Sequence, residues 1–449
     1  MKRTSRPTMM AAGLLAGSLL LSACGAGGRE EGSGSGSDGS GSGEPAGDTT
    51  GITDTTIKLG THTPLTGVAA PGYSEISTGT KAYFDYVNDN GGIDGRQIEY
   101  VVKDDGYNPT NTSQVTNELV LQEQIFGLIG GLGTPTHGAV VDFLNQEEVP
   151  DLFVSSGSIA WGDDVEAKPF TFGWQPDYEI EGKILGQYVK ENFPDAKVGL
   201  FLQDDDLGAD GEKGLRQFID GQIVGVARYT SGNTDVAPQI TKLQSSGADL
   251  VIGFNTPAYT ALTQLVSQAT QFDPQWIYTN VGSDPALVGA LLANFSEGAT
   301  DGEGALDGVL TTAYIPGIDT PEDPWVKLWQ KVWDANGGEG ELTNFRIYGM
   351  SQAYTFVQAL RAAGDDLSRE GIVAAIEENG AGFAGPNLAP YRYSKDSHLG
   401  ISGMRVIELQ GLKSEEKTPV LTTDLGGASI DADASDQAND SPPSSGIPE

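Results

Sequence analysis

Two short loops rich in hydroxyl groups are the first candidates for chemistry in this sequence. Thr134 stands in one of them, within GGLGTP at 130–135, and Ser155–Ser158 (SSGS) forms the other. Each loop follows an apolar run typical of a buried parallel strand, Ile125–Ile129 or Leu152–Val154. In open α/β sheets, ligands bind outside the carboxyl ends of the strands. The two loops should therefore face one crevice, which is the candidate site.

The segment between these loops reads as a helix. Thr134 followed by Pro135 predicts an N-cap and a first-turn proline, and a helical face of His137, Val140, Val141 and Leu144 follows. The start of a helix presents free N–H groups and a partial positive charge, so it can hold an anion without a basic residue. Thr134 either caps the helix only or also contacts a ligand.

Enzyme chemistry finds little support in the sequence. The run at 131–136 lacks the third glycine of a dinucleotide-binding loop, and the strand that follows ends at Val154-Ser155 without the expected acid. No G-x-S-x-G nucleophile elbow occurs. The three histidines, His62, His137 and His398, are scattered and are interpreted as structural, and no spacing suits a metal ion. We therefore expect a protein that is not an enzyme and has no cofactor.

The length of the chain predicts more than one core. About 370 residues lie between Thr55 and Leu425, which is more than a single hydrophobic core usually holds. Strand-like and helix-like segments alternate throughout, which favours parallel sheets with right-handed crossovers. The sequence thus predicts an α/β fold with two doubly wound, parallel-sheet lobes that face each other across a hinge.

The two ends of the chain differ from this pattern. Residues 1–24 read as an export signal, with a basic start and an apolar stretch, Met9–Leu21, that is too short to span a bilayer. Residues 25–53 are rich in glycine and serine and are expected to be a disordered tether, and the acidic residues 426–449 a disordered tail. The formal charge of −36 argues against nucleic-acid binding.

The signal ends in Leu21-Ser22-Ala23-Cys24, which resembles the bacterial lipobox. This resemblance implies cleavage before Cys24 and attachment of lipid, including palmitate, to that residue. Cys24 is the only cysteine in the chain. A lipid followed by a tether implies a protein anchored on the extracytoplasmic face of the bacterial cell membrane.

The order of several segments resembles that of the branched-chain amino-acid-type solute-binding proteins of ABC importers. The matching runs are THTPLTG at 61–67, AYFDYVNDNGGIDGR at 82–96, VVKDDGYNP at 101–109, GGLGTPTHGAVVDFLNQEEVPDLF at 130–153, QDDDLGADG at 203–211 and YGMSQAYTFVQALRAAG at 348–364. The resemblance implies the type I periplasmic-binding-protein clamshell. Its lobes would comprise residues 54–173 with about 310–398, and residues 174–309 with about 399–425.

The resemblance also implies a function and a set of ligand contacts. A monomer would capture a small polar solute, an amino acid or a related amide or carboxylate, and deliver it to an ABC permease. The solute's carboxylate would be held by two loops, at Gly133-Thr134 and at Ser155-Ser156-Gly157. Trp161 and Asn280 are further candidates for contact with the ligand, and Trp174, Tyr348 and Tyr73 are weaker ones.

One departure from the family concerns the ligand's ammonium group. Relatives that bind aliphatic amino acids place a carboxylate in the loop that corresponds to Asn280–Ser283, which here reads NVGS with no acid until Asp284. The acid is absent, or it is relocated to Asp205, Asp206 or Asp284. An amide, a carboxylate without an amine, or an aromatic acid therefore stays open beside the amino acids. A ligand-sensing receptor of the same fold, coupled to a signalling partner, is the alternative function.

Overall fold

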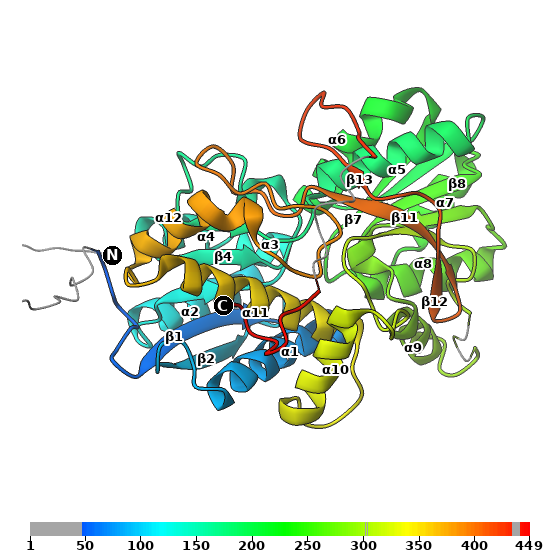
Figure 1. Cartoon of the computed structure of the whole chain (residues 1–449). Helices are drawn as coiled ribbons and strands as arrows, with labels where there is room; N and C mark the ends of the chain where they lie inside the picture. Colours follow the sequence, from blue (N-terminus) through cyan, green and yellow to red (C-terminus); the bar gives the residue numbers. More distant parts are fainter. Residues whose placement is uncertain (1–46, 301, 303, 433–440) are drawn as a thin grey trace, which may run out of the picture. The chain divides into compact units, whose positions relative to one another are not determined.

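Two α/β lobes make up the protein, seen in a computed structural model that describes residues 47–300, 302, 304–432 and 441–449 (Figure 1). The first sheet has the order β2-β1-β3-β4-β5, and every neighbouring pair in it is parallel. Its strands are β1 (Thr56–Thr63), β2 (Gln97–Asp104), β3 (Gly127–Ile129), β4 (Asp151–Val154) and β5 (Thr171–Gly173). The short, apolar β3 and β4 are fully buried, as the sequence predicts.

Helices from two distant parts of the chain belong to this first lobe. They are α1 (Ala70–Asp89), α2 (Pro109–Leu121), α3 (Thr134–His137), α4 (Val141–Gln146), α10 (Pro324–Asn336), α11 (Asn344–Ala363) and α12 (Arg369–Asn379). The helices α1 and α11 pack backbone to backbone, because a Cβ atom at Gly79 would lie 2.3 Å from the carbonyl oxygen of Arg346. Likewise, a Cβ atom at Gly349 would lie 2.1 Å from the carbonyl oxygen of Ile76. Glycine therefore fixes how the late helix α11 joins the first lobe.

The second sheet is parallel through β7, β6, β8, β9 and β10, and antiparallel at β11, β12 and β13. Its strands are β6 (Val198–Gln203), β7 (Ile223–Tyr229), β8 (Leu250–Phe254), β9 (Gln275–Tyr278), β10 (Leu310–Ala313), β11 (Gly403–Gln410), β12 (Lys413–Glu416) and β13 (Leu421–Thr422). Its helices are α5 (Tyr178–Asn192), α6 (Asp206–Ile219), α7 (Ala237–Ser245), α8 (Pro257–Thr270) and α9 (Pro285–Phe295). The α/β class and the two-lobe architecture are confirmed.

One lobe boundary differs from the expectation. The sequence assigns residues from about 310 onward to the first lobe, but β10 pairs with β9 and β11 and so belongs to the second sheet. The chain therefore returns to the first lobe after Ala313. A short apolar strand carries no signal for which of two sheets it joins, since both offer the same hydrogen bonds and the same apolar environment.

Parts of the expected tether and tail are ordered against the first lobe. The backbone carbonyl of Asp48 accepts from the N–H of Arg369 at 2.8 Å. At the other end, Tyr86 and Tyr83 donate from their hydroxyls to the carbonyls of Ser445, at 2.7 Å, and Gly446, at 2.9 Å. Composition predicts that ordering such segments costs conformational entropy, but it does not predict which surfaces of the folded lobe they contact. The export signal and Cys24 lie outside the described residues, among which no helix is long and apolar enough to cross a membrane.

The predicted helix from Thr134 to Leu144 is broken into two. The helix α3 ends at His137, and α4 begins only at Val141, after Val140 has left the helical conformation with φ −129°. The N-cap position belongs to Gly133, and no side chain caps α3, so the prediction that Thr134 is the N-cap is wrong. The Thr134 hydroxyl lies 2.8 Å from the Ser156 hydroxyl instead.

A buried chain of four ionisable side chains crosses the first lobe. The His62 ring lies 2.9 Å from Asp105 through Nδ1 and 3.1 Å from His137 Nδ1 through Nε2, and His137 Nε2 lies 2.8 Å from Asp151. All four side chains are fully buried. The structural interpretation of these histidines is supported, but they are not scattered, because the fold brings His62 and His137 together across 75 positions of sequence. Burial lowers the pKa of His62, and the hydrogen bond to Asp105 opposes that shift.

Replacing His62 with glutamine should destabilise the protein in a pH-dependent way. The pKa of His62 in the folded state lies below its unfolded value of about 6.5. As the pH falls, His62 is therefore protonated in the unfolded chain before it is protonated in the folded one. The stability that His62 contributes is therefore fully present above pH 6.5 and is lost below it. We expect His62→Gln to lower the free energy of unfolding by about 2–4 kcal/mol at pH 7.5. The difference from the unchanged protein should shrink at pH 5.5. Urea unfolding at both pH values measures this, and a difference that stays constant contradicts it.

Candidate functional site

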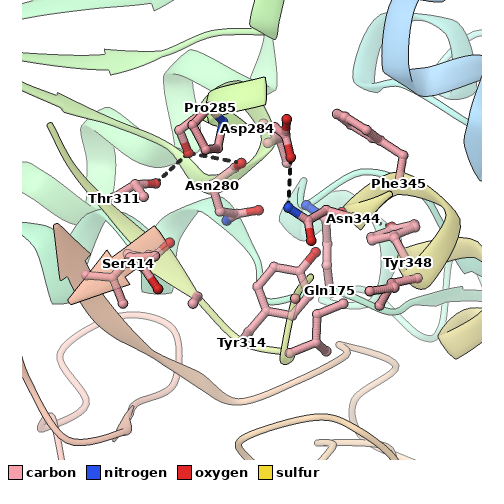
Figure 2. A pocket seen from close by; sticks show the side chains of 18 of the residues that line it. Gln175, Asn280, Asp284, Pro285, Thr311, Tyr314, Asn344, Phe345, Tyr348 and Ser414 are labelled. Atoms are coloured by element: carbon pink, nitrogen blue, oxygen red, sulfur yellow. Dashed lines mark hydrogen bonds between the residues drawn. The ribbon is translucent and has the colours of Figure 1, made fainter. Parts of the chain in front are cut away.

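A cavity of about 410 Å³ lies between the two sheets' loops (Figure 2). Its wall includes Gly133, Thr134 and Ser155 from loops of the first lobe, and Asn280 from the second. Aromatic side chains make up much of the remaining wall: Tyr73, Tyr107, Tyr178, Tyr314, Phe345 and Tyr348. The cavity is of the size that proteins use for small organic ligands.

The first-lobe wall is built from the loops after β3 and β4, which pair with each other. The Gly133 N–H donates to the Ser155 carbonyl at 3.2 Å, and the Ser155 N–H donates to the Gly131 carbonyl at 3.0 Å. Gly133 has φ +100°, and a Cβ atom there would lie 2.5 Å from both the Tyr107 ring and the Thr136 hydroxyl. Only glycine fits this turn, which brings the backbone itself to the cavity.

The second-lobe wall depends on Glu181, a fully buried residue of α5. Its carboxylate accepts from the Asn280 N–H at 2.8 Å and from the hydroxyls of Thr279 and Thr312, both at 2.6 Å. Burial raises the pKa of Glu181, and these hydrogen bonds oppose the shift. Glu181 thereby ties the exits of β9 and β10 together. The sequence analysis missed it, although an acid three and four positions before Ile184 and Leu185 is a signal, since it falls on the apolar helix face.

Gln175 and Tyr348 carry polar groups into the aromatic wall. The Tyr348 hydroxyl donates to Gln175 Oε1 at 3.0 Å. Gln175 is 4% exposed, and its Nε2 atom has no hydrogen-bond partner in the described part of the chain. Burial raises the pKa of Tyr348. A buried amide N–H without a partner is costly, and a ligand acceptor would satisfy it.

Several contacts join the two lobes around the cavity. The Tyr73 hydroxyl, on α1, donates to the Val281 carbonyl at 3.2 Å. The Asn344 amide, on α11, donates to the Asp284 carboxylate at 2.8 Å (Figure 2). Asp284 also accepts from the Leu287 N–H at 2.8 Å and so caps α9. Removal from water raises the pKa of Asp284.

The structure brings four of the eight predicted ligand-binding residues to the cavity wall, namely Gly133, Thr134, Ser155 and Asn280. Two more lie directly behind the wall. The Ser156 hydroxyl meets that of Thr134, and the Gly157 carbonyl accepts from the Tyr178 N–H at 2.7 Å. Of the weaker candidates, Tyr73 and Tyr348 line the cavity and Trp174 does not.

Trp161 and Asp206 are not among the lining residues. Trp161 is 2% exposed and packs edge-on against His137, with a ring-centroid distance of 4.9 Å, in an apolar cluster with Val141 and Val154. Asp206 is exposed in the first turn of α6, and its neighbour Leu207 faces the cavity instead. Adjacent side chains of a helix point about 100° apart, so residues 206 and 207 cannot both face the cavity. The prediction for the QDDDLG loop did not allow for this.

Within residues 47–300, 302, 304–432 and 441–449, no group of three or more His, Cys, Asp or Glu side chains could hold a metal ion. The arrangement of hydroxyls, amides and aromatic rings is suited to binding a neutral or anionic organic molecule.

Comparison with known proteins places this geometry in context. A family model described as periplasmic binding protein matches residues 56–416. The Leu/Ile/Val-binding protein homolog 1 of Brucella suis biovar 1 (strain 1330) is 24% identical over 329 residues, which cover 72% of this chain and 83% of that protein.

Two solved structures share the fold. The fatty acid ABC transporter substrate-binding protein from Thermomonospora curvata is 21% identical, with a TM-score of 0.72 over 84% of this chain and 95% of that one. A branched chain amino acid ABC transporter from Thermus thermophilus with bound valine is 20% identical, with a TM-score of 0.69 over 83% of this chain and 98% of that one.

The contact between Asp210 of α6 and the first-lobe loop should respond to pH. Asp210 Oδ2 accepts from the Ile159 N–H at 3.0 Å, and burial raises the pKa of Asp210 to about 7. The unfolded carboxyl ionises near 3.8, so stability is lost as the pH rises from about 3.8 to about 7. Asparagine keeps an acceptor for Ile159 and cannot ionise.

We therefore expect Asp210→Asn to gain about 1–3 kcal/mol of unfolding free energy over the unchanged protein between pH 4.5 and pH 7.5, and to keep that gain at higher pH. Denaturant unfolding at pH 4.5, 6 and 8 measures the difference. Asp195→Asn, an exposed change in the same lobe, is the control. Equal pH profiles for Asp210→Asn and the unchanged protein would rule out this pKa.

Proposed function

The chain belongs to the periplasmic binding protein family, and we propose that it captures a small organic solute outside the cytoplasm and delivers it to an ABC importer. The solute is an amino acid or a related amide or carboxylate. The observation that carries this proposal is the cavity, which is lined by polar groups and aromatic rings from both lobes.

Capture by two lobes follows from the position of the cavity. A solute that touches both walls has more contacts when the lobes are together than when they are apart, so its binding favours the closed form. The bonds from Tyr73 to Val281 and from Asn344 to Asp284 lie at the same junction and would form and break with that motion. The closed form would be the one that the permease recognises.

Four residues are proposed as direct contacts. The backbone at Gly133 and the hydroxyls of Thr134 and Ser155 would hold the solute from the first lobe, and Asn280 from the second. The Ser156 hydroxyl lies 2.8 Å from the Thr134 hydroxyl and would orient it. Gly157 would support the Tyr178 ring through its backbone.

The names of the structural neighbours do not select one solute. One neighbour carries bound valine and another is named for fatty acids. The same scaffold therefore accompanies different ligand chemistries, and the choice must come from the residues of this cavity.

The proposed function predicts stabilisation by a solute of the expected classes. A thermal-shift series would test amino acids, their amides, short carboxylic acids and aromatic acids. A ligand at about 100 times its dissociation constant stabilises the folded state by about 2.7 kcal/mol, which raises the melting temperature by a few degrees. A series without any stabilising compound contradicts the function.

The hydroxyl of Thr134 should matter for affinity. Thr134→Val removes the hydroxyl and keeps the shape of the side chain, so we expect the solute's affinity to fall by about 1–3 kcal/mol. The matched control is Thr116→Val, because the buried Thr116 hydroxyl, in the same lobe, has no partner among the described residues and does not line the cavity. Isothermal titration of both variants with the stabilising solute makes the comparison. Unchanged affinity in Thr134→Val removes Thr134 from the site.

We also propose that the chain is a lipoprotein, held at the membrane through lipid on Cys24. The lipobox-like run Leu21–Cys24 and the Gly/Ser-rich segment after it support this. In cells, Cys24→Ser should abolish labelling by radioactive palmitate and release the protein from the membrane fraction. Labelling that persists in the variant contradicts the anchor.

A further inference from the structure

The cavity wall holds hydrogen-bond donors that the described residues leave free. Gln175 Nε2 is buried and has no partner among the described residues. Its partner on the other amide atom is the Tyr348 hydroxyl, which donates to Gln175 Oε1 at 3.0 Å. The N–H end of the amide is therefore the end left for the cavity.

Tyr314 supplies a second group of this kind. It follows β10 in the chain and lines the cavity, and Figure 2 shows its ring reaching in from the lower wall. Its hydroxyl has no hydrogen-bond partner in the part of the chain that the structure describes, and its residue is 7% exposed. A strict donor at Gln175 and a hydroxyl at Tyr314 both suit an oxygen acceptor on the ligand.

The carboxylates of the cavity are already engaged. Asp284 accepts from Leu287 and Asn344, Asp323 caps α10 through the Trp325 N–H, and Asp319 accepts from the Ser414 hydroxyl. The fourth lining acid, Glu416, pairs with Arg405. An ammonium group brought into this cavity would compete with these donors for a carboxylate, and a buried ammonium without an anionic partner is unfavourable.

Beyond the donors, the wall is apolar and elongated. Ile407 and Leu409 of β11 add aliphatic side chains to the aromatic ones in the wall. Figure 2 shows Tyr348 and Ser414 on opposite sides of Tyr314. Aromatic and aliphatic walls of this kind cover an apolar ligand body.

We propose that the solute is an amine-free organic acid or amide with an aromatic or aliphatic body, whose carbonyl or carboxylate oxygen accepts from Gln175 Nε2. This inference rests on the proposed function and narrows its ligand to one class. Gln175 and Tyr314 then determine specificity, because both can offer a hydrogen-bond donor to the ligand. The ammonium group of an amino acid is itself a donor and could not accept from them.

Matched pairs of ligands test this directly. Isothermal titration of the purified protein would compare 3-phenylpropanoate with L-phenylalanine, and 4-methylpentanoate with L-leucine, which differ only in the ammonium group. We expect the amine-free member of at least one pair to bind at least tenfold more tightly. Equal or tighter binding of both amino acids overturns the inference and leaves the proposed function standing.

Three variants locate the effect. Gln175→Leu should weaken the amine-free ligand at least tenfold, whereas Gln187→Leu, on the outer face of α5, should leave its affinity unchanged. Tyr314→Phe removes only a hydroxyl and should weaken binding about threefold to tenfold, which keeps the test valid if Gln175→Leu does not fold.

The inference is also overturned if none of the four compounds binds in the isothermal titration. The broader thermal-shift series then decides separately on the proposed function, because stabilisation by any other solute in it keeps the binding role and excludes only this ligand class.

Discussion

The chain of hydrogen bonds from Asp105 through His62 and His137 to Asp151 holds the first-lobe wall in place. It links β1, the residue after β2, the helix α3 and the first residue of β4, and all of its members are fully buried. The loop that lines the cavity rests on this pair, since a Cβ atom at Gly131 would lie 2.6 Å from His137 Nδ1 and 2.7 Å from His62 Nε2.

In the second lobe, a single buried acid holds the cavity wall in place. Glu181 accepts from three donors, one backbone N–H and two threonine hydroxyls, and no basic side chain pairs with it among the described residues. Its raised pKa is the expected consequence of burial that neutral donors offset only in part. In both lobes, then, a buried carboxyl group beneath the sheet edge fixes loops that carry neutral groups to the cavity.

The position of these buried carboxyl groups behind the cavity wall explains which chemical groups the wall presents to a ligand. The lining carboxylates are engaged with other protein groups, and much of the wall presents amides, hydroxyls and aromatic rings. A neutral wall with fixed donors can discriminate by hydrogen-bond pattern, because a ligand that presents the wrong group leaves a buried donor unsatisfied. The formal charge of −36 has little to do with this recognition, since it belongs to the chain as a whole.

The sequence by itself determined the fold class, the number of lobes and the two hydroxyl-rich loops. These features are local, because strand and helix periodicity and the small residues after each strand are visible within a dozen positions. They led to Thr134 and Ser155, and the family resemblance added Gly133 and Asn280; all four line the cavity.

Only the tertiary structure decided what depends on contacts between distant segments. It paired His62 with His137, assigned β10 to the second sheet, and brought Gln175 to the cavity while Trp161 went into an apolar cluster. The sequence carries the type of each of these side chains, but not its neighbours. Neighbours decide whether a polar group is satisfied or left free for a ligand, and they are set by packing between segments that the chain itself keeps far apart.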